Sequence, residues 1–178
     1  MVRAQIDGMQ AGITRVKTRL PAFPAEQILL SRLIVVLGRE YSAHHDRLLR
    51  PRGLTEADFR VLAALFSRDG EAFPSDLCIS MAQSPANITR IADALVERGL
   101  ITRVSSETDR RRMVLRITER GTALLHECLP FTAELARGMF ACLSAEEIRA
   151  MTAQLIRVAG SLDATAERDD LAETAVAP

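Results

Sequence analysis

Three consecutive arginines, Arg110, Arg111 and Arg112, directly follow Asp109 in the middle of the segment VSSETDRRRMVLRIT. Three neighbouring guanidinium groups repel one another, so this run of charge needs a partner of opposite sign. Planar guanidinium groups bind phosphate through paired hydrogen bonds, and arginines also enter the narrow, electronegative minor groove of DNA. We therefore expect all three arginines to contact nucleic acid and Asp109 to orient one of them.

A second group of polar residues lies on a predicted helix, SPANITRIADALVERG, which starts at Ser84. On a helical wheel the aliphatic side chains share one face, and the opposite face carries small, amide and guanidinium groups near the helix N-terminus. Such groups suit the base edges of a DNA major groove, although an ordinary amphipathic surface helix carries the same pattern. The helix by itself leaves both interpretations open. On the outward face and its flanks lie Ala86, Asn87, Thr89, Arg90 and Asp93, the last of which we expect to pair with an arginine of the neighbouring hairpin.

Two strand-like segments, LITRV and MVLRIT, bracket the arginines and predict a β-hairpin. A short helix of about residues 75–81 precedes Ser84, the expected N-cap, and Gly99 ends the longer helix. Two short helices joined by a tight turn form a helix-turn-helix, and the hairpin is its wing. The basic wing beside this helix favours nucleic-acid binding. The expected fold is mainly α with a small β-hairpin wing, a winged helix-turn-helix.

Longer helical segments are expected on both sides of the winged helix. Residues 1–25 end in LPAFPAE and should form an irregular lead-in, and a very apolar helix follows to about Arg50. Beyond the wing, a helix should be kinked or broken at Pro130, and a last helix begins at Ser144. Residues 166–178 show no clear pattern and are expected to be a flexible tail.

The last helix carries an apolar heptad pattern, in which intervals of three and four residues alternate. Such a seam is packed either within the chain or against a second copy. Because the first long helix is apolar on more than one side, burial against a second copy is favoured, and we expect a homodimer. The residues of this expected interface are Ile148, Met151, Leu155, Val158 and Leu162.

The composition limits the classes of function. The chain has 178 residues, 48% of them hydrophobic and 4% aromatic, and a net charge of +0, so one mostly helical domain is expected and any nucleic-acid interface must depend on local charge. Cys78, Cys128 and Cys142 show no metal-ligand spacing and suit a reducing compartment. No signal peptide, membrane segment or catalytic constellation is recognisable, which predicts a cytoplasmic protein that is not an enzyme and uses no cofactor or metal.

Over about residues 26–165 the sequence resembles the MarR family of bacterial transcription regulators, on the segments ITRIADALVERGLITRV, DRR and LRITERG. The resemblance implies a homodimer in which a winged helix at about 55–118 binds a pseudo-palindromic operator in double-stranded DNA. Helices at about 26–50 and 119–165 would form the dimerisation domain. By this resemblance the contacts to bases and phosphates fall on Ser84, Asn87, Thr89 and Arg90, and the minor-groove contact falls on Arg111.

Two positions depart from the family's pattern. Ala82 stands in the turn before the recognition helix, where glycine is common, and Pro85 replaces a residue that is commonly polar. These departures concern the geometry of the turn and one phosphate contact.

The segments FPAEQILL and LLHECLP are most similar to family members that repress multidrug efflux operons. That similarity implies release from DNA by small hydrophobic or aromatic weak acids, bound between the dimerisation helices and the DNA-binding lobe. The first two helices offer apolar side chains for such a pocket, although packing within the core explains each residue as well. The expected pocket residues are Leu33, Leu37, Tyr41, His44, Phe59 and Leu62.

Two other functions fit parts of the pattern. A winged helix can serve as a protein-interaction module, in which the arginines would meet an acidic protein partner. A redox-responsive regulator is the second alternative, because oxidation of Cys78 in the short helix would disturb DNA binding.

Overall fold

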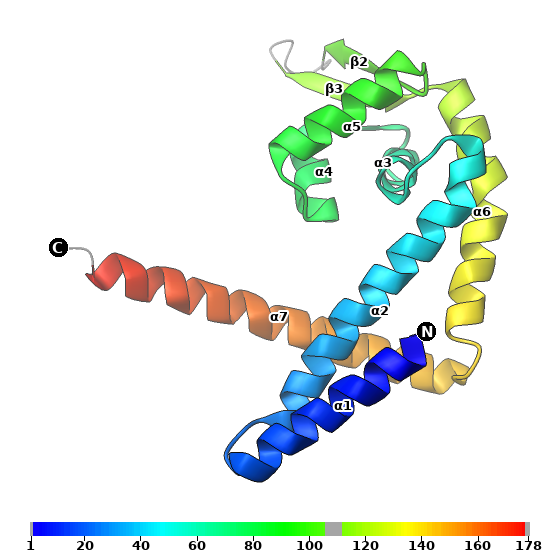
Figure 1. The fold of residues 1–178 in the computed structure, drawn as a ribbon. Helices are drawn as coiled ribbons and strands as arrows, with labels where there is room; N and C mark the ends of the chain where they lie inside the picture. Colours follow the sequence, from blue (N-terminus) through cyan, green and yellow to red (C-terminus); the bar gives the residue numbers. More distant parts are fainter. Residues whose placement is uncertain (1, 106–111, 177–178) are drawn as a thin grey trace. The chain divides into compact units, whose positions relative to one another are not determined.

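The computed structural model describes residues 2–105 and 112–176, with side chains described up to Asp163. Contacts divide the chain into two units, Met1–Thr132 and Ala133–Pro178. Figure 1 shows the helices and strands. Their order is α1 (Val2–Arg19), α2 (Ala25–Leu49), η1 (Arg50–Arg52), α3 (Glu56–Phe66), β1 (Glu71–Ala72), α4 (Pro74–Met81), α5 (Pro85–Glu97), β2 (Ile101–Ser105), β3 (Met113–Ile117), α6 (Glu119–Met139) and α7 (Ala145–Val176).

A helix, α1, occupies most of the segment expected to be an irregular lead-in, so that prediction for residues 1–25 was wrong. Ile6, Met9 and Ile13 recur at intervals of three and four, which is the helical pattern the prediction overlooked. Ile13 is buried, and α1 packs against α2 (Figure 1). The prolines of LPAFPAE mark only the turn between the two helices, and Pro24 is the N-cap of α2.

Local capping signals set the start of α3. The hydroxyl oxygen of Thr55 accepts a hydrogen bond from the Asp58 backbone N–H at 3.1 Å, and the Asp58 carboxylate accepts one from the Thr55 backbone N–H at 2.9 Å. This capping box satisfies two donors that the first turn of a helix otherwise leaves unpaired. Just before it, Gly53 ends the 3-10 turn η1 with a φ of 68°, a conformation that favours glycine.

The predicted helix-turn-helix is confirmed as α4 and α5, which pack on α3. Ala82 follows α4 with a φ of 51° and a ψ of 48°, in the left-handed region. A Cβ atom is strained in that region, which gives a physical reason why glycine is common at this position in the family. The tight turn is therefore kept in spite of the alanine.

The predicted hairpin is part of a three-stranded antiparallel sheet with the strand order β1-β3-β2. β2 and β3 pair along their length, from Ile101 opposite Ile117 to Ser105 opposite Met113. The short strand β1, which the sequence analysis did not predict, pairs Ala72 with Leu115. Its two residues gain their strand conformation from β3, so they carry little signal of their own.

The core of the first unit is aliphatic and lies among α3, α4, α5 and the sheet, with contributions from the end of α2 and from α6. Gly121 lets α6 approach the sheet closely, because a Cβ atom there would overlap the carbonyl oxygen of Leu100. Side chains under 2% exposed include Leu49, Val61, Leu62, Leu65, Leu77, Ile88, Leu95, Leu100, Ile101, Leu115 and Leu125.

The two C-terminal helices are longer and more regular than expected. Pro130 lies inside α6, which runs on to Met139 without a break. The last helix, α7, continues to Val176, so residues 166–176 are helical although the sequence shows no clear pattern there, and the expected flexibility of residues 166–178 stays a prediction. Ser144 caps α7 as predicted, and its backbone N–H and hydroxyl both donate to the Glu147 carboxylate, which lowers the pKa of that carboxyl.

None of the helices in the described part of the chain combines the length and the hydrophobicity that crossing a lipid bilayer requires.

His45 on α2 is only 3% exposed, and neither of its ring nitrogens has a hydrogen-bond partner among the described residues. The ring packs between Tyr41 and Phe59, at centroid distances of 5.6 Å and 5.1 Å. Burial lowers the pKa of the imidazole from its ordinary value of 6.5, and the adjacent Asp46 opposes this shift. The folded protein therefore favours neutral His45.

Because the folded protein favours neutral His45, part of its folding stability should be lost in acid. The unfolded chain protonates His45 at a higher pH than the folded chain, so the stability contributed by neutral His45 is present above about pH 6.5 and is lost as the pH falls below it. Urea unfolding of the wild type, His45→Leu and His44→Leu at about pH 7 and about pH 5.5 tests this. His45→Leu should lose less free energy of unfolding on acidification, whereas the exposed neighbour His44→Leu should behave like the wild type. An equal acid loss in all three proteins would contradict the assignment.

Candidate nucleic-acid interface

The recognition helix α5 begins at the cap expected from the sequence. The Ser84 hydroxyl accepts a hydrogen bond from the Asn87 backbone N–H at 3.3 Å, and Pro85 occupies the first helical position. A proline costs no hydrogen bond there, because the first N–H groups of a helix have no partner within it. The first turn of α5 is thereby fixed in direction, with its backbone N–H groups pointing out of the helix end.

The predicted division of α5 into two faces is confirmed. Ile88, Ile91, Ala92 and Leu95 are each at most 2% exposed and pack into the core. This apolar face fixes the rotation of the helix, so the opposite face must point away from the protein. The outward side chains are Ala86, Thr89, Arg90 and Asp93, which are exposed, and Asn87, which is half-buried at the flank.

Hydrogen bonds order the polar groups at the start of α5. Arg90 donates from Nη2 to the Asn87 side-chain oxygen at 2.8 Å, and the Asn87 amide donates to the side chain of Gln83. The Thr89 hydroxyl donates to the Pro85 carbonyl at 2.9 Å. The sequence analysis missed Gln83, which lies in the turn before the Ser84 cap. An amide and a guanidinium held in this way lose less side-chain entropy when they bind a base edge.

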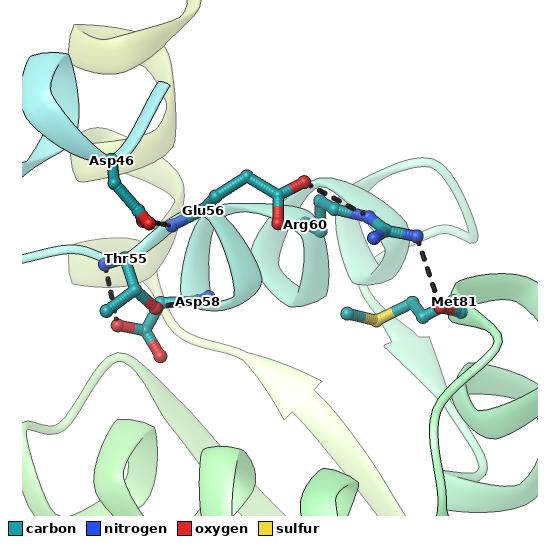
Figure 2. Close-up of polar contacts among 6 residues, drawn as sticks. All are labelled: Asp46, Thr55, Glu56, Asp58, Arg60 and Met81. Carbon is teal, nitrogen blue, oxygen red and sulfur yellow. Dashed lines mark hydrogen bonds and ion pairs between the residues drawn. The ribbon is translucent and has the colours of Figure 1, made fainter. Parts of the chain in front are cut away.

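A chain of polar contacts ties the turn before α5 to α3 and α2, as Figure 2 shows. Arg60 donates from Nη2 to the carbonyl of Met81, the last residue of α4, at 3.4 Å, and its Nε lies 3.6 Å from a Glu56 carboxylate oxygen. The Glu56 backbone N–H donates to Asp46 on α2 at 2.6 Å. Burial raises the pKa of the Glu56 carboxyl, Arg60 lowers it and Asp46 raises it further. Glu56 and Arg60 are four residues apart, a spacing at which side chains of a helix meet, so this ion pair could have been predicted from the sequence.

The described arginines of the hairpin each contact another element. Arg103 on β2 lies 2.6 Å from the Asp93 carboxylate, which confirms the expectation that Asp93 pairs with an arginine of the hairpin. Arg116 on β3 donates from Nε and Nη2 to Glu71 on β1, at 3.0 and 2.8 Å. These pairs fix the wing against the recognition helix on one side and against β1 on the other.

Arg112 contacts an aromatic ring of the protein, and its expected contact with DNA stays a prediction. Its guanidinium carbon lies 3.8 Å from the centroid of the Phe73 ring, at the start of α4. Asp109, Arg110 and Arg111 lie outside the described residues. Their expected roles, orientation by Asp109 and DNA contact by the two arginines, therefore remain predictions from the sequence.

The structure brings together only part of the predicted ligand pocket. Tyr41 and Phe59 meet through the ring of His45, whereas His44 is exposed and takes no part in this contact. The reason is the geometry of the helix. His45 lies four residues after Tyr41 and His44 three, and in a helix the fourth residue lies closer to the face of the first than the third residue does. Leu62 is fully buried in the core, Leu33 is half-buried and Leu37 is 41% exposed.

The residues of the predicted dimer seam are all exposed in the single chain. Ile148 is 37% exposed, and exposure increases along α7 to 70% at Leu162. The helix α2 also exposes large apolar side chains, with Val35 at 69%. A row of exposed large apolar side chains along one helix typically marks a site that another molecule covers.

The cysteines differ in environment. Cys78 is half-buried, Cys128 is buried and Cys142 is exposed. Burial raises the pKa of the Cys128 thiol, which Arg52 lowers and Glu127 raises, so this thiol is a poor nucleophile. Among the described side chains, no three histidine, cysteine or carboxylate groups are grouped so that they could hold a metal ion.

Comparison with known proteins gives a consistent result. The model of the MarR family matches residues 52–112. The transcriptional repressor MprA of Escherichia coli (strain K12) is 35% identical over 126 residues, which cover 70% of this chain and 72% of MprA. A crystal structure of a mutant MarR from E. coli complexed with operator DNA has 25% identity and a TM-score of 0.68, and covers 75% of this chain and 95% of that chain. BpsR of Bordetella bronchiseptica, described for the regulation of its DNA binding by 6-hydroxynicotinic acid, has 25% identity and a TM-score of 0.66 over 72% of this chain and 91% of BpsR.

The geometry of α5 predicts a specific effect of Arg90→Ala. Because Arg90 is exposed and oriented by Asn87, its removal should cost ~1–3 kcal/mol of DNA-binding free energy and relax the base preference at one position. Binding to duplexes varied one base pair at a time measures both effects. The control is Arg3→Ala, which removes the same charge from an exposed position on α1 and should leave the base preference unchanged. Equal base preference in Arg90→Ala and the wild type would contradict a role of Arg90 in base recognition.

Proposed function

The chain belongs to the MarR family of transcriptional regulators, and we propose that it is a homodimeric repressor that binds a pseudo-palindromic operator and leaves it when a hydrophobic weak acid binds. The observation that carries the proposal is α5, whose apolar face is buried and whose outward face holds the ordered pair of Asn87 and Arg90. The proposed target is a multidrug efflux or stress-resistance operon, as the sequence similarity to efflux repressors implies.

DNA binding is supported by chemistry and by the relatives. Arginine pairs with guanine and asparagine with adenine through two hydrogen bonds, and both side chains stand at the start of a helix that can enter the major groove. The N-terminal end of α5 adds a favourable site for a phosphate. The operator-bound MarR mutant of E. coli shares the fold at 25% identity. We propose Ser84, Asn87, Thr89 and Arg90 as the main contacts of α5.

The homodimer is supported by the apolar surface of the two longest helices. Leu155 and its heptad neighbours on α7 are exposed, as are Leu30 and Val35 on α2. A second copy would cover such surfaces, and a two-fold dimer would present two copies of α5 to half-sites about 10 bp apart. The dimer therefore explains both the exposed seam and the expected pseudo-palindromic operator.

The ligand site is proposed around His45, in place of His44. Buried polar groups nearly always have hydrogen-bond partners, and the two ring nitrogens of His45 have none within the part of the chain that the structure describes. A weak acid with an aromatic ring would stack on Tyr41 or Phe59 and supply a carboxylate or hydroxyl group to the imidazole. BpsR, whose DNA binding is regulated by 6-hydroxynicotinic acid, is a relative whose ligand has this chemistry.

Selection from random duplex DNA tests the operator and the dimer together. The expected result is an enriched inverted repeat whose half-sites are centred about 10 bp apart. An enriched single half-site would contradict the dimer, and the absence of any enriched sequence would favour the protein-interaction module instead. The same selection with Arg90→Ala should return a repeat that is degenerate at one position in each half-site.

The ligand proposal predicts reciprocal effects. If a weak acid favours the conformation that does not bind DNA, then operator DNA must weaken its binding by the same factor, and a factor of roughly 5–150 is ordinary for such coupling. Titration of salicylate-like aromatics and protonophoric uncouplers into free and DNA-bound protein measures it. His45→Leu should weaken ligand binding, while His44→Leu should not. Equal affinity of these compounds for the two forms would show that they are not the effectors.

A further inference from the structure

The contact between Arg112 and Phe73 joins the hairpin to the start of the helix-turn-helix. Arg112 directly precedes β3, and its guanidinium carbon lies 3.8 Å from the centroid of the Phe73 ring. Phe73 is half-buried, is the N-cap of α4 and is followed by Pro74 at the first helical position. The backbone on both sides of the ring is therefore constrained, by pairing of β1 before it and by the helix after it.

Strand register places this contact on a defined face of the sheet. Ala72 pairs with Leu115, so Phe73 would continue opposite Val114, and alternation puts Arg112 and Val114 on the same face. A cavity of about 450 Å³ lies on this face, lined by Phe73, Val104 and Val114 among others. Asp76 of α4 also lines this cavity, and α4 contacts β3 directly, so the Arg112–Phe73 contact adds to the packing of the hairpin on α4.

We propose that Arg112 is a positioning residue: by stacking on Phe73 it fixes the hairpin relative to α4, and it does not itself contact DNA. The proposal rests on the proposed DNA-binding function and refines it, because it divides the arginine run by role. It also gives Phe73 a role in DNA affinity, although Phe73 is not among the residues expected to contact DNA.

Two physical arguments favour this role for Arg112. A guanidinium group over an aromatic face gains electrostatic attraction from the ring and keeps its apolar edges out of water. The Phe73 ring is also held in place by β1 before it and by α4 after it, so it offers the guanidinium group a fixed anchor. At an exposed site such a contact contributes ~0.5–1 kcal/mol, which corresponds to a factor of about two to five at 1.4 kcal/mol per tenfold.

Hydrogen exchange of the free protein tests the positioning role without DNA. Arg112→Ala and Phe73→Leu should each increase amide exchange in β2 and β3 next to the loop, at Ser105 and Met113, by about two- to fivefold. The double variant should exchange no faster than either single variant, because both changes break one contact. The control is Phe66→Leu, an exposed aromatic residue that packs on His126 and should leave the hairpin unchanged. Unchanged exchange in Arg112→Ala would overturn the proposal.

The salt dependence of DNA binding separates positioning from direct contact. Loss of a phosphate contact makes the dependence of affinity on salt shallower by about one unit of slope per contact. A positioning role predicts that Arg112→Ala and Phe73→Leu weaken affinity about two- to fivefold per half-site with the slope unchanged. A shallower slope in Arg112→Ala together with normal affinity in Phe73→Leu would overturn the proposal. If the wild type binds no selected DNA, the proposed function fails, and hydrogen exchange still decides whether the contact holds the hairpin.

Discussion

The buried carboxylate of Asp58 is the constraint on which the DNA-binding unit depends. It is 9% exposed, and a carboxylate at that depth costs stability unless hydrogen bonds and positive charge compensate it. The Thr55 backbone N–H donates to it at 2.9 Å, and Arg98 at the end of α5 lies 3.8 Å away. One side chain thus fixes where α3 begins and holds the far end of α5 to it. Because α3 packs against α2, α4, α5, β1 and β3, its position determines theirs.

The repulsion within the arginine-rich hairpin is met partly by the protein itself. Arg103, Arg112 and Arg116 each contact a different neighbour, on α5, at the start of α4 and on β1. Of the three partners, only Phe73 is half-buried, and the other two are exposed carboxylates. Exposed ion pairs contribute little stability, so these contacts matter mainly for the position of the hairpin. Their value is directional: each limits how the hairpin can tilt. The arginines of the hairpin therefore help to hold it in place, in addition to giving it positive charge.

Much of the fold could be predicted because its signals are local. The cap at Ser84, the start of the last helix at Ser144 and the apolar face of α5 depend on neighbouring residues in the sequence, and the structure confirms them. Other features depend on distant partners. Strand β1 forms because β3 lies beside it. Arg112 contacts Phe73, which lies 39 positions earlier in the sequence. The histidine that faces Phe59 depends on the phase of a long helix, which a wheel fixes only to within one residue.

The structure also offers a short route by which a bound acid could affect the turn before α5. His45 is adjacent in sequence to Asp46, whose carboxylate accepts the Glu56 backbone N–H, and Arg60 connects Glu56 to the carbonyl of Met81 (Figure 2). On the proposed function, a ligand anion at His45 would favour the charged imidazole and so alter the field at Asp46. The change would shift the DNA-binding equilibrium only if the acid binds the two conformations with different affinity. His45 would then be linked to Glu56, the first residue of α3, through the adjacent Asp46 and its hydrogen bond, in addition to the direct ring contact of His45 with Phe59 on α3.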